Sequence, residues 1–62
     1  MKYKDLIKNL KMHGWFLLRQ GGKHEIWSNG EQEEPVPRHR EIHEQLAKKI
    51  IKKAKAHPNT KE

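Results

Sequence analysis

Residues 15–30, WFLLRQGGKHEIWSNG, contain two short apolar runs separated by glycines. The run from Trp15 to Leu18 follows a helix-ending glycine and is too short for a helix of its own, so it predicts a strand. Gly21-Gly22 predict a turn, and the residues from His24 to Ser28 predict a second strand. Asn29-Gly30 is a strong hairpin signal. The stretch therefore predicts adjacent antiparallel strands at the centre of the chain.

A third strand is expected from Glu33 to Arg38, although this segment contains Pro35 and Pro37. Backbone N–H groups two residues apart point to the same side of a strand, so both missing donors lie on one edge. An edge strand tolerates this arrangement. A strict two-residue hairpin turn would place Glu25 opposite Glu34, which is unfavourable, so a longer loop is expected.

Amphipathic helices are predicted on both sides of the strands. The first has apolar residues at positions i, i+3, i+4 and i+7, namely Tyr3, Leu6, Ile7 and Leu10, and Gly14 is placed to end it. The second is expected from Glu41, with an apolar face of Ile42, Leu46, Ile50 and Ala54, although no capping residue marks its start. The order α-β-β-β-α predicts a two-layer α+β sandwich with one sheet face open. We expect a single domain over residues 1–55 and a polar tail over residues 56–62.

Composition narrows the possible partners. The 62 residues include no cysteine and carry a net charge of +6. Most of that charge lies in residues 38–62, where eight Lys/Arg face three Asp/Glu. Such a basic half attracts nucleic acid, an anionic membrane surface or an acidic protein. No apolar run approaches a membrane span and the start lacks a signal-peptide pattern, so we expect a cytoplasmic protein with no membrane partner.

Five histidines are the main candidates for chemistry. His13 and His57 fall at helix ends, where a structural or solvated role is expected. His39 and His43 have the spacing of two metal ligands, but no Cys or Asp stands near them, so no metal site is predicted. His24 follows the glycine turn at the start of the second strand. Strand parity places His24 on the open face if Trp27 packs under the helices, and parity alone leaves the opposite arrangement open.

A histidine on an open face beside cations suits RNA cleavage by the neighbouring 2′-hydroxyl. Imidazole titrates near neutrality and can transfer the proton, while fixed cations stabilise charge on the phosphate. The candidate phosphate contacts are Arg19, Lys23, Arg38 and Arg40. Judged on chemistry alone, an isolated histidine is more often structural. The lysines of the second helix are expected to be solvated, to contact RNA phosphates or to dock an acidic partner.

Several short motifs together resemble the HicA family of toxins. They are the opening LIKNL helix, Gly14-Trp15 leading to Arg19, the turn Gly22-Lys23-His24, and Val36-Pro37-Arg38-His39 before a helix. They cover residues 1 to about 55 in the family's order and spacing.

The resemblance implies a double-stranded-RNA-binding-domain-like fold and metal-independent cleavage of mRNA, with His24 as the catalytic residue and no cofactor. It also implies a HicB antitoxin that binds the toxin and covers its active surface. One position differs, because Lys23 stands where the family often has serine. Two other hypotheses remain: a non-catalytic RNA-binding module of similar fold, and an inactive protein that keeps only its partner-binding surface.

Overall fold

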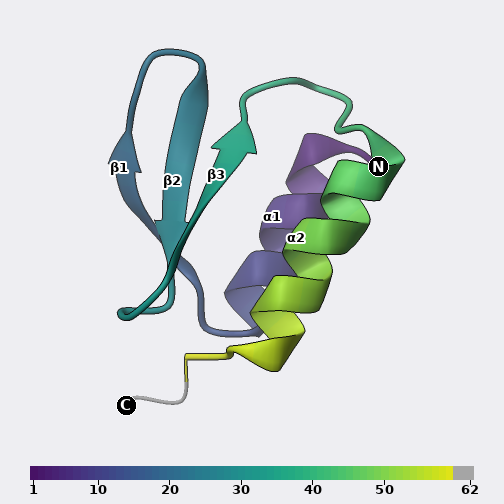
Figure 1. The fold of residues 1–62 in the computed structure, drawn as a ribbon. Coiled ribbons are helices and arrows are strands. Elements are labelled where there is room, and N and C mark those ends of the chain that lie inside the picture. The colour runs from purple at the N-terminus through teal and green to yellow at the C-terminus, as the bar shows by residue number, and fades with distance from the viewer. Residues whose placement is uncertain (60–62) are drawn as a thin grey trace.

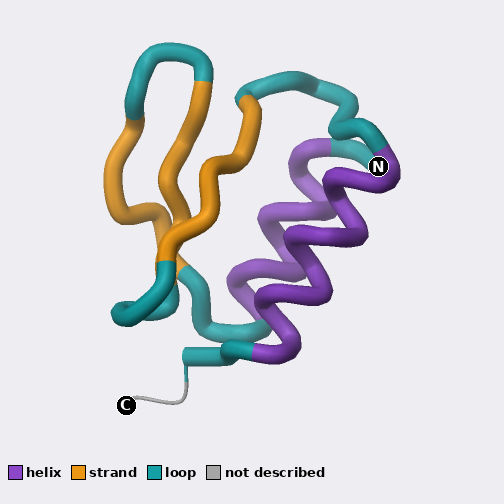
Figure 2. Tube along the Cα trace, viewed as in Figure 1, coloured by secondary structure: helices purple, strands orange, loops and turns teal. Residues whose placement is uncertain are grey.

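The computed structural model describes residues 1–59 of the chain. Two helices pack on a three-stranded antiparallel sheet, in the order α1 (Tyr3–Met12), β1 (Phe16–Gln20), β2 (His24–Ser28), β3 (Glu33–Pro37) and α2 (Glu44–Ala56) (Figure 1). The sheet and the helix pair form two layers (Figure 2). The predicted α+β architecture and α-β-β-β-α order are therefore confirmed. The last three residues of the expected polar tail, 60–62, lie outside the described part of the chain.

β2 lies at the centre of the sheet, with β1 and β3 as its edges. Ser28 pairs with Glu33, so the β2–β3 loop has four residues, and Glu25 lies opposite Val36. The expectation of a loop longer than two residues is confirmed. Pro35 and Pro37 occupy an edge strand, as their missing N–H donors require.

The core lies between the helices and the inner face of β2 and β3. The largest side chains that are less than 2% exposed are Leu6, Leu10, Val36 and Ile50. Trp27 is 4% exposed, so the parity question is decided in favour of Trp27 under the helices. β1 is the strand farthest from the helices (Figure 1), and all five of its residues are exposed, including Phe16, Leu17 and Leu18.

The turn after α1 depends on Gly14. Its φ of 83° is in the left-handed region that favours glycine, and a Cβ at this position would overlap the carbonyl oxygen of Asn59. Asn59 also bonds here, through its N–H to His13 O at 2.9 Å and through its amide nitrogen to Gly14 O at 3.1 Å. The close approach fastens the segment after α2 to the end of α1.

The start of the second helix differs from the sequence prediction. α2 begins at Glu44, so the predicted start at Glu41 is wrong by three residues. The segment before it is extended instead, because it pairs with the beginning of the chain: Lys2 and Glu41 form an antiparallel bridge, and Ile42 N–H donates to Met1 O at 2.7 Å. Ile42 is buried, as predicted, but it belongs to this connection and not to the helix.

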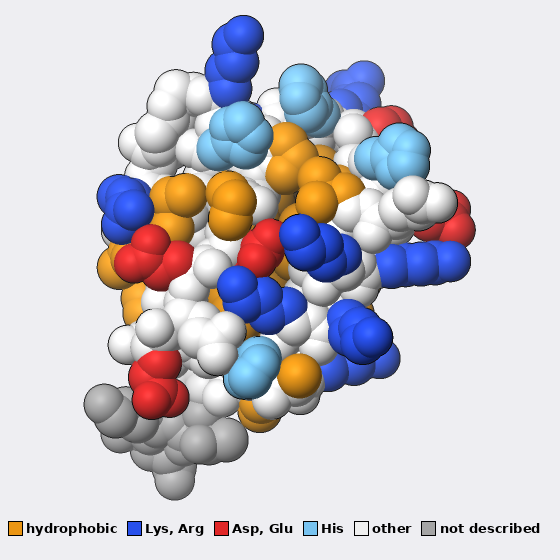
Figure 3. Space-filling model, viewed as in Figure 1, with side chains coloured by type: hydrophobic (Ala, Val, Ile, Leu, Met, Phe, Trp, Pro, Cys, Tyr) orange, Lys and Arg blue, Asp and Glu red, His pale blue; other side chains and the backbone are white. Residues whose placement is uncertain are grey.

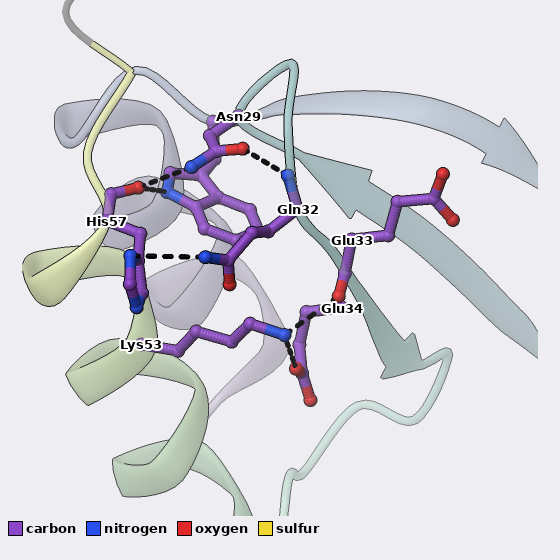
Figure 4. Close-up of polar contacts among 7 residues, drawn as sticks. Asn29, Gln32, Glu33, Glu34, Lys53 and His57 are labelled. Carbon is purple, nitrogen blue, oxygen red and sulfur yellow. Dashed lines mark hydrogen bonds and ion pairs between the residues drawn. The ribbon is translucent and has the colours of Figure 1, made fainter.

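The end of α2 is tied to the β2–β3 loop by polar contacts (Figure 4). The His57 carbonyl accepts hydrogen bonds from Asn29 Nδ2 at 2.8 Å and from the indole N–H of Trp15 at 2.9 Å. Lys53 Nζ donates to Glu33 O at 2.9 Å and to a carboxylate oxygen of Glu34 at 3.0 Å. These contacts hold the end of α2 against the sheet at the end of the molecule opposite to the β1–β2 loop.

Candidate nucleic-acid interface

Three segments meet at one end of the molecule: the β1–β2 loop, the connection from β3 to α2, and the start of α1 (Figure 1). Basic and histidine side chains gather over this end in the space-filling view (Figure 3). Four of the five predicted site residues lie at this end: Lys23 in the β1–β2 loop, His24 at the start of β2, and Arg38 and Arg40 after β3. The fold therefore brings most of the predicted site together.

His24 is the first residue of β2 and is exposed to solvent. Its neighbour across the sheet is Pro37, and its carbonyl accepts the N–H of Gly21 at 3.0 Å, which closes the glycine turn. Since successive strand residues point to opposite faces and Glu25 and Trp27 are buried, the imidazole lies on the open face. A ligand can reach it without any movement of the core.

Arg38 is held beside the glycine turn by several contacts. Its backbone N–H donates to the carbonyl oxygen of Lys23 at 3.1 Å. Its side-chain Nε lies 3.9 Å from a carboxylate oxygen of Glu25. In the amide orientation that pairs the two groups, the side-chain oxygen of Gln20 accepts from both terminal guanidinium nitrogens, at 3.0 and 3.1 Å. These bonds orient the planar guanidinium, which suits it to recognise a phosphate.

Arg19 and Arg40 have different surroundings. Arg19 lies on exposed β1 opposite Ile26, and its guanidinium pairs with Glu33 at 3.2 Å. Glu33 is aligned with Ser28, at the opposite end of β2 from His24, so the structure directs Arg19 away from the histidine. Arg40 is exposed after β3, and its carbonyl accepts the N–H of Tyr3 at 2.9 Å.

A buried polar cluster beneath this end escaped the sequence prediction. Glu25 is 8% exposed and accepts hydrogen bonds from the hydroxyl of Tyr3 and from the indole N–H of Trp27, the latter at 3.1 Å. A buried carboxylate needs such partners to remain stable. Strand parity placed Glu25 on the same face as Trp27, which was the available signal, but its partner Tyr3 is 22 residues away in sequence.

Tyr3 reports on this cluster because it is the only tyrosine of the chain. Burial, together with the hydrogen bond and negative charge of Glu25, raises the pKa of Tyr3 from 10.0 to about 12, while the charge of Arg38 acts in the opposite direction. The folded state thus holds the phenol proton more tightly than the unfolded state. This contribution to stability is complete below pH 10.0 and is lost as the pH rises through about 12.

We expect a tyrosinate absorbance titration of the folded protein to have its midpoint near pH 12. Glu25→Gln removes the carboxylate charge, so its midpoint should move down toward 10.0, the ordinary pKa of tyrosine. An unfolding curve recorded at each pH will show whether the variant is still folded during the titration. Equal midpoints in the two folded proteins would contradict the role given to Glu25.

Among residues 1–59, no group of three or more His, Cys, Asp or Glu side chains could hold a metal ion. Lys53 of α2 forms an ion pair with Glu34, and Lys48 forms one with Glu44, one helical turn away, at 3.3 Å. No helix in the described residues has the length and apolar character to cross a membrane.

The fold and this end of the molecule define a small basic two-layer α+β domain with an exposed histidine and several cations at one end of its sheet. A family model described as the HicA toxin of bacterial toxin–antitoxin systems matches residues 3–56. The chain therefore belongs to the HicA toxin family, as its motifs indicated, and this membership implies an antitoxin partner. No match was found among curated proteins or solved structures.

Proposed function

We propose that this HicA toxin is an endoribonuclease that cleaves mRNA without a metal ion, with His24 as its catalytic residue. The observation that carries the proposal is the placement of His24, an exposed imidazole at the start of β2, in a chain whose residues 3–56 match the HicA toxin. Lys23 and Arg38 lie next to it on the turn and on the neighbouring chain segment. The proposed site of action is the cytoplasm, where mRNA is translated.

The reaction requires two proton transfers. The 2′-oxygen attacks the adjacent phosphorus and loses its proton, while the bond from phosphorus to the 5′-oxygen breaks and that oxygen gains a proton. The products are a 2′,3′-cyclic phosphate and a 5′-hydroxyl. His24 performs one of these transfers, as general base in the neutral form or general acid in the protonated form. Lys23 and the oriented Arg38 stabilise negative charge on the phosphate oxygens.

The natural inhibitor in this proposal is a HicB-like antitoxin that covers the end of the molecule carrying His24. Blocking this end would prevent RNA from reaching the imidazole, whatever other surface the antitoxin contacts. The cations on the same end would attract acidic side chains of the antitoxin as they attract phosphates.

Incubation of the purified protein with a labelled mRNA in excess EDTA tests the activity. We expect discrete fragments that end in a 2′,3′-cyclic phosphate, because the proposed chemistry uses the RNA's own 2′-hydroxyl and protein side chains only. An RNA in which every 2′-hydroxyl is methylated should remain intact. If several RNAs are retained by the protein but none is cut, the non-catalytic RNA-binding module is the correct function.

A further inference from the structure

A basic pocket lies at the start of β2, the strand end that carries His24. It is lined by the start of α1 with the residue before it, by the residues that follow β3, and by Glu25 of β2. The lysine, arginine and histidine side chains that line it are Lys2, Lys4, Arg38, His39 and Arg40. Lys2, Lys4 and His39 have no role in the proposed cleavage.

The start of the chain and the segment that follows β3 are held together by backbone contacts. Lys2 and Glu41 form an antiparallel bridge, and the N–H of Tyr3 donates to the carbonyl of Arg40 at 2.9 Å. Backbone segments almost forty residues apart in sequence are therefore held together, and their cations line one space. Because the backbone already brings the two segments together, an anion binds without the cost of assembling them.

The charge of the pocket is unbalanced. Four Lys/Arg side chains line it, against one carboxylate, that of Glu25. Glu25 is already engaged by Tyr3, Trp27 and Arg38. Lys2, Lys4 and Arg40 make no ion pair within the described residues. Like charges gathered in one place repel each other, and a bound anion removes that repulsion.

The pocket and His24 lie on opposite faces of the same strand end. Glu25, which lines the pocket, directly follows His24, and neighbouring strand residues point to opposite faces. Arg38 contacts both sites. It lines the pocket, and its backbone N–H donates a hydrogen bond to the carbonyl of Lys23 in the glycine turn. A polyanion that passes over this end can thus contact both places.

We propose that this pocket is a phosphate subsite, in which Lys2, Lys4 and Arg40 hold a phosphodiester of the RNA strand other than the one cleaved at His24. The inference rests on the proposed function and adds to it a second point of attachment. Its ligand class is the phosphodiester backbone, whose phosphate oxygens lysine and arginine side chains bind. The subsite would fix the register of the strand relative to His24.

The test compares two pairs of lysines, one from the start of α1 and the residue before it, the other from farther along the helix. Lys2→Gln with Lys4→Gln removes two charges from the pocket, and Lys8→Gln with Lys11→Gln removes two exposed charges farther along α1. Binding of a fully 2′-O-methylated single-stranded RNA is measured at several salt concentrations. This probe cannot be cut through its 2′-oxygens, so binding is measured independently of catalysis. Circular dichroism and thermal unfolding establish that both variants fold.

We expect the pocket variant to bind the RNA about 10-fold more weakly at low salt and the Lys8/Lys11 variant less than about 2-fold more weakly. The slope of log K against log salt should become shallower by about 0.7 for each phosphate contact that is lost. Equal losses in both variants, or unchanged RNA affinity in the pocket variant, would overturn the subsite. Unchanged RNA affinity would overturn the subsite even if the pocket variant bound an acidic protein more weakly.

The outcome separates this inference from the proposed function. If the pocket variant binds RNA more weakly and the wild-type protein does not cut unmodified mRNA, the subsite is supported and the ribonuclease proposal is overturned. Cleavage of mRNA with full RNA affinity in the pocket variant would support the ribonuclease and overturn the subsite.

Discussion

Replacement of His24 by alanine is expected to lower the rate of RNA cleavage by at least about 100-fold, the lower end of what a positioned acid–base group contributes. The reason is the loss of the proposed proton transfer, since His24 is exposed and its side chain supports no part of the core. The fold should therefore be unchanged. Initial rates of mRNA cleavage in EDTA and far-UV circular dichroism of the same preparations measure both effects.

Two further variants sharpen the interpretation. His24→Gln keeps a hydrogen-bonding side chain that cannot transfer a proton near neutral pH, and we expect it to be as inactive as the alanine variant. His43→Ala removes another exposed histidine, one that makes no capping hydrogen bond, and should cleave RNA at the wild-type rate. Full activity in a folded His24→Ala protein would show that the catalytic residue is elsewhere.

Trp27→Ala should have the largest effect on stability. The side chain is 4% exposed at the centre of the sheet, and its indole N–H bonds to buried Glu25. Truncation of a buried tryptophan costs about 3–5 kcal/mol. A domain of 62 residues has a total stability of about 3–9 kcal/mol at typical values per residue, so much of the protein is expected to unfold.

Urea denaturation of the variant and of the wild type measures this loss. The matched control is Phe16→Ala, a similar truncation on the neighbouring strand, where the ring is 41% exposed. It should cost about 1 kcal/mol or less, because little apolar surface is lost from the interior. Similar losses for the two variants would mean that Trp27 is not the centre of the core.

The sequence predicted the elements well where periodicity was strong. The spacing of Leu6, Ile7 and Leu10 placed α1, and the glycines and the Asn29-Gly30 signal placed the turns around β2. Local patterns are sufficient here because each apolar face or turn is encoded within a few residues. The prolines of β3 were also informative, since a missing donor is a local property that restricts a strand to an edge.

The start of α2 was misplaced because the deciding interaction is not local. Ile42 has a helical apolar spacing to Leu46, but residues 41–42 pair with the start of the chain. The contacts are the Lys2–Glu41 bridge and the bond from Ile42 N–H to Met1 O. Backbone groups satisfied by a distant segment have no need of a helix. Nothing in the residues around Glu41 carries information about that partner.

In the candidate site too, some features follow from local sequence and others from contacts between distant segments. The sequence by itself determined that His24 would begin a central strand after a flexible turn, with Lys23 beside it, because strand parity and turn chemistry are local. Only the tertiary structure decided that Trp27 packs inward, that Glu25 is buried against Tyr3, and that Arg19 turns toward Glu33. It alone brought Lys2 and Lys4 beside Arg40. The physical reason is that burial and ion pairing depend on which distant segments of the chain meet. The local pattern of residues does not specify which segments these are.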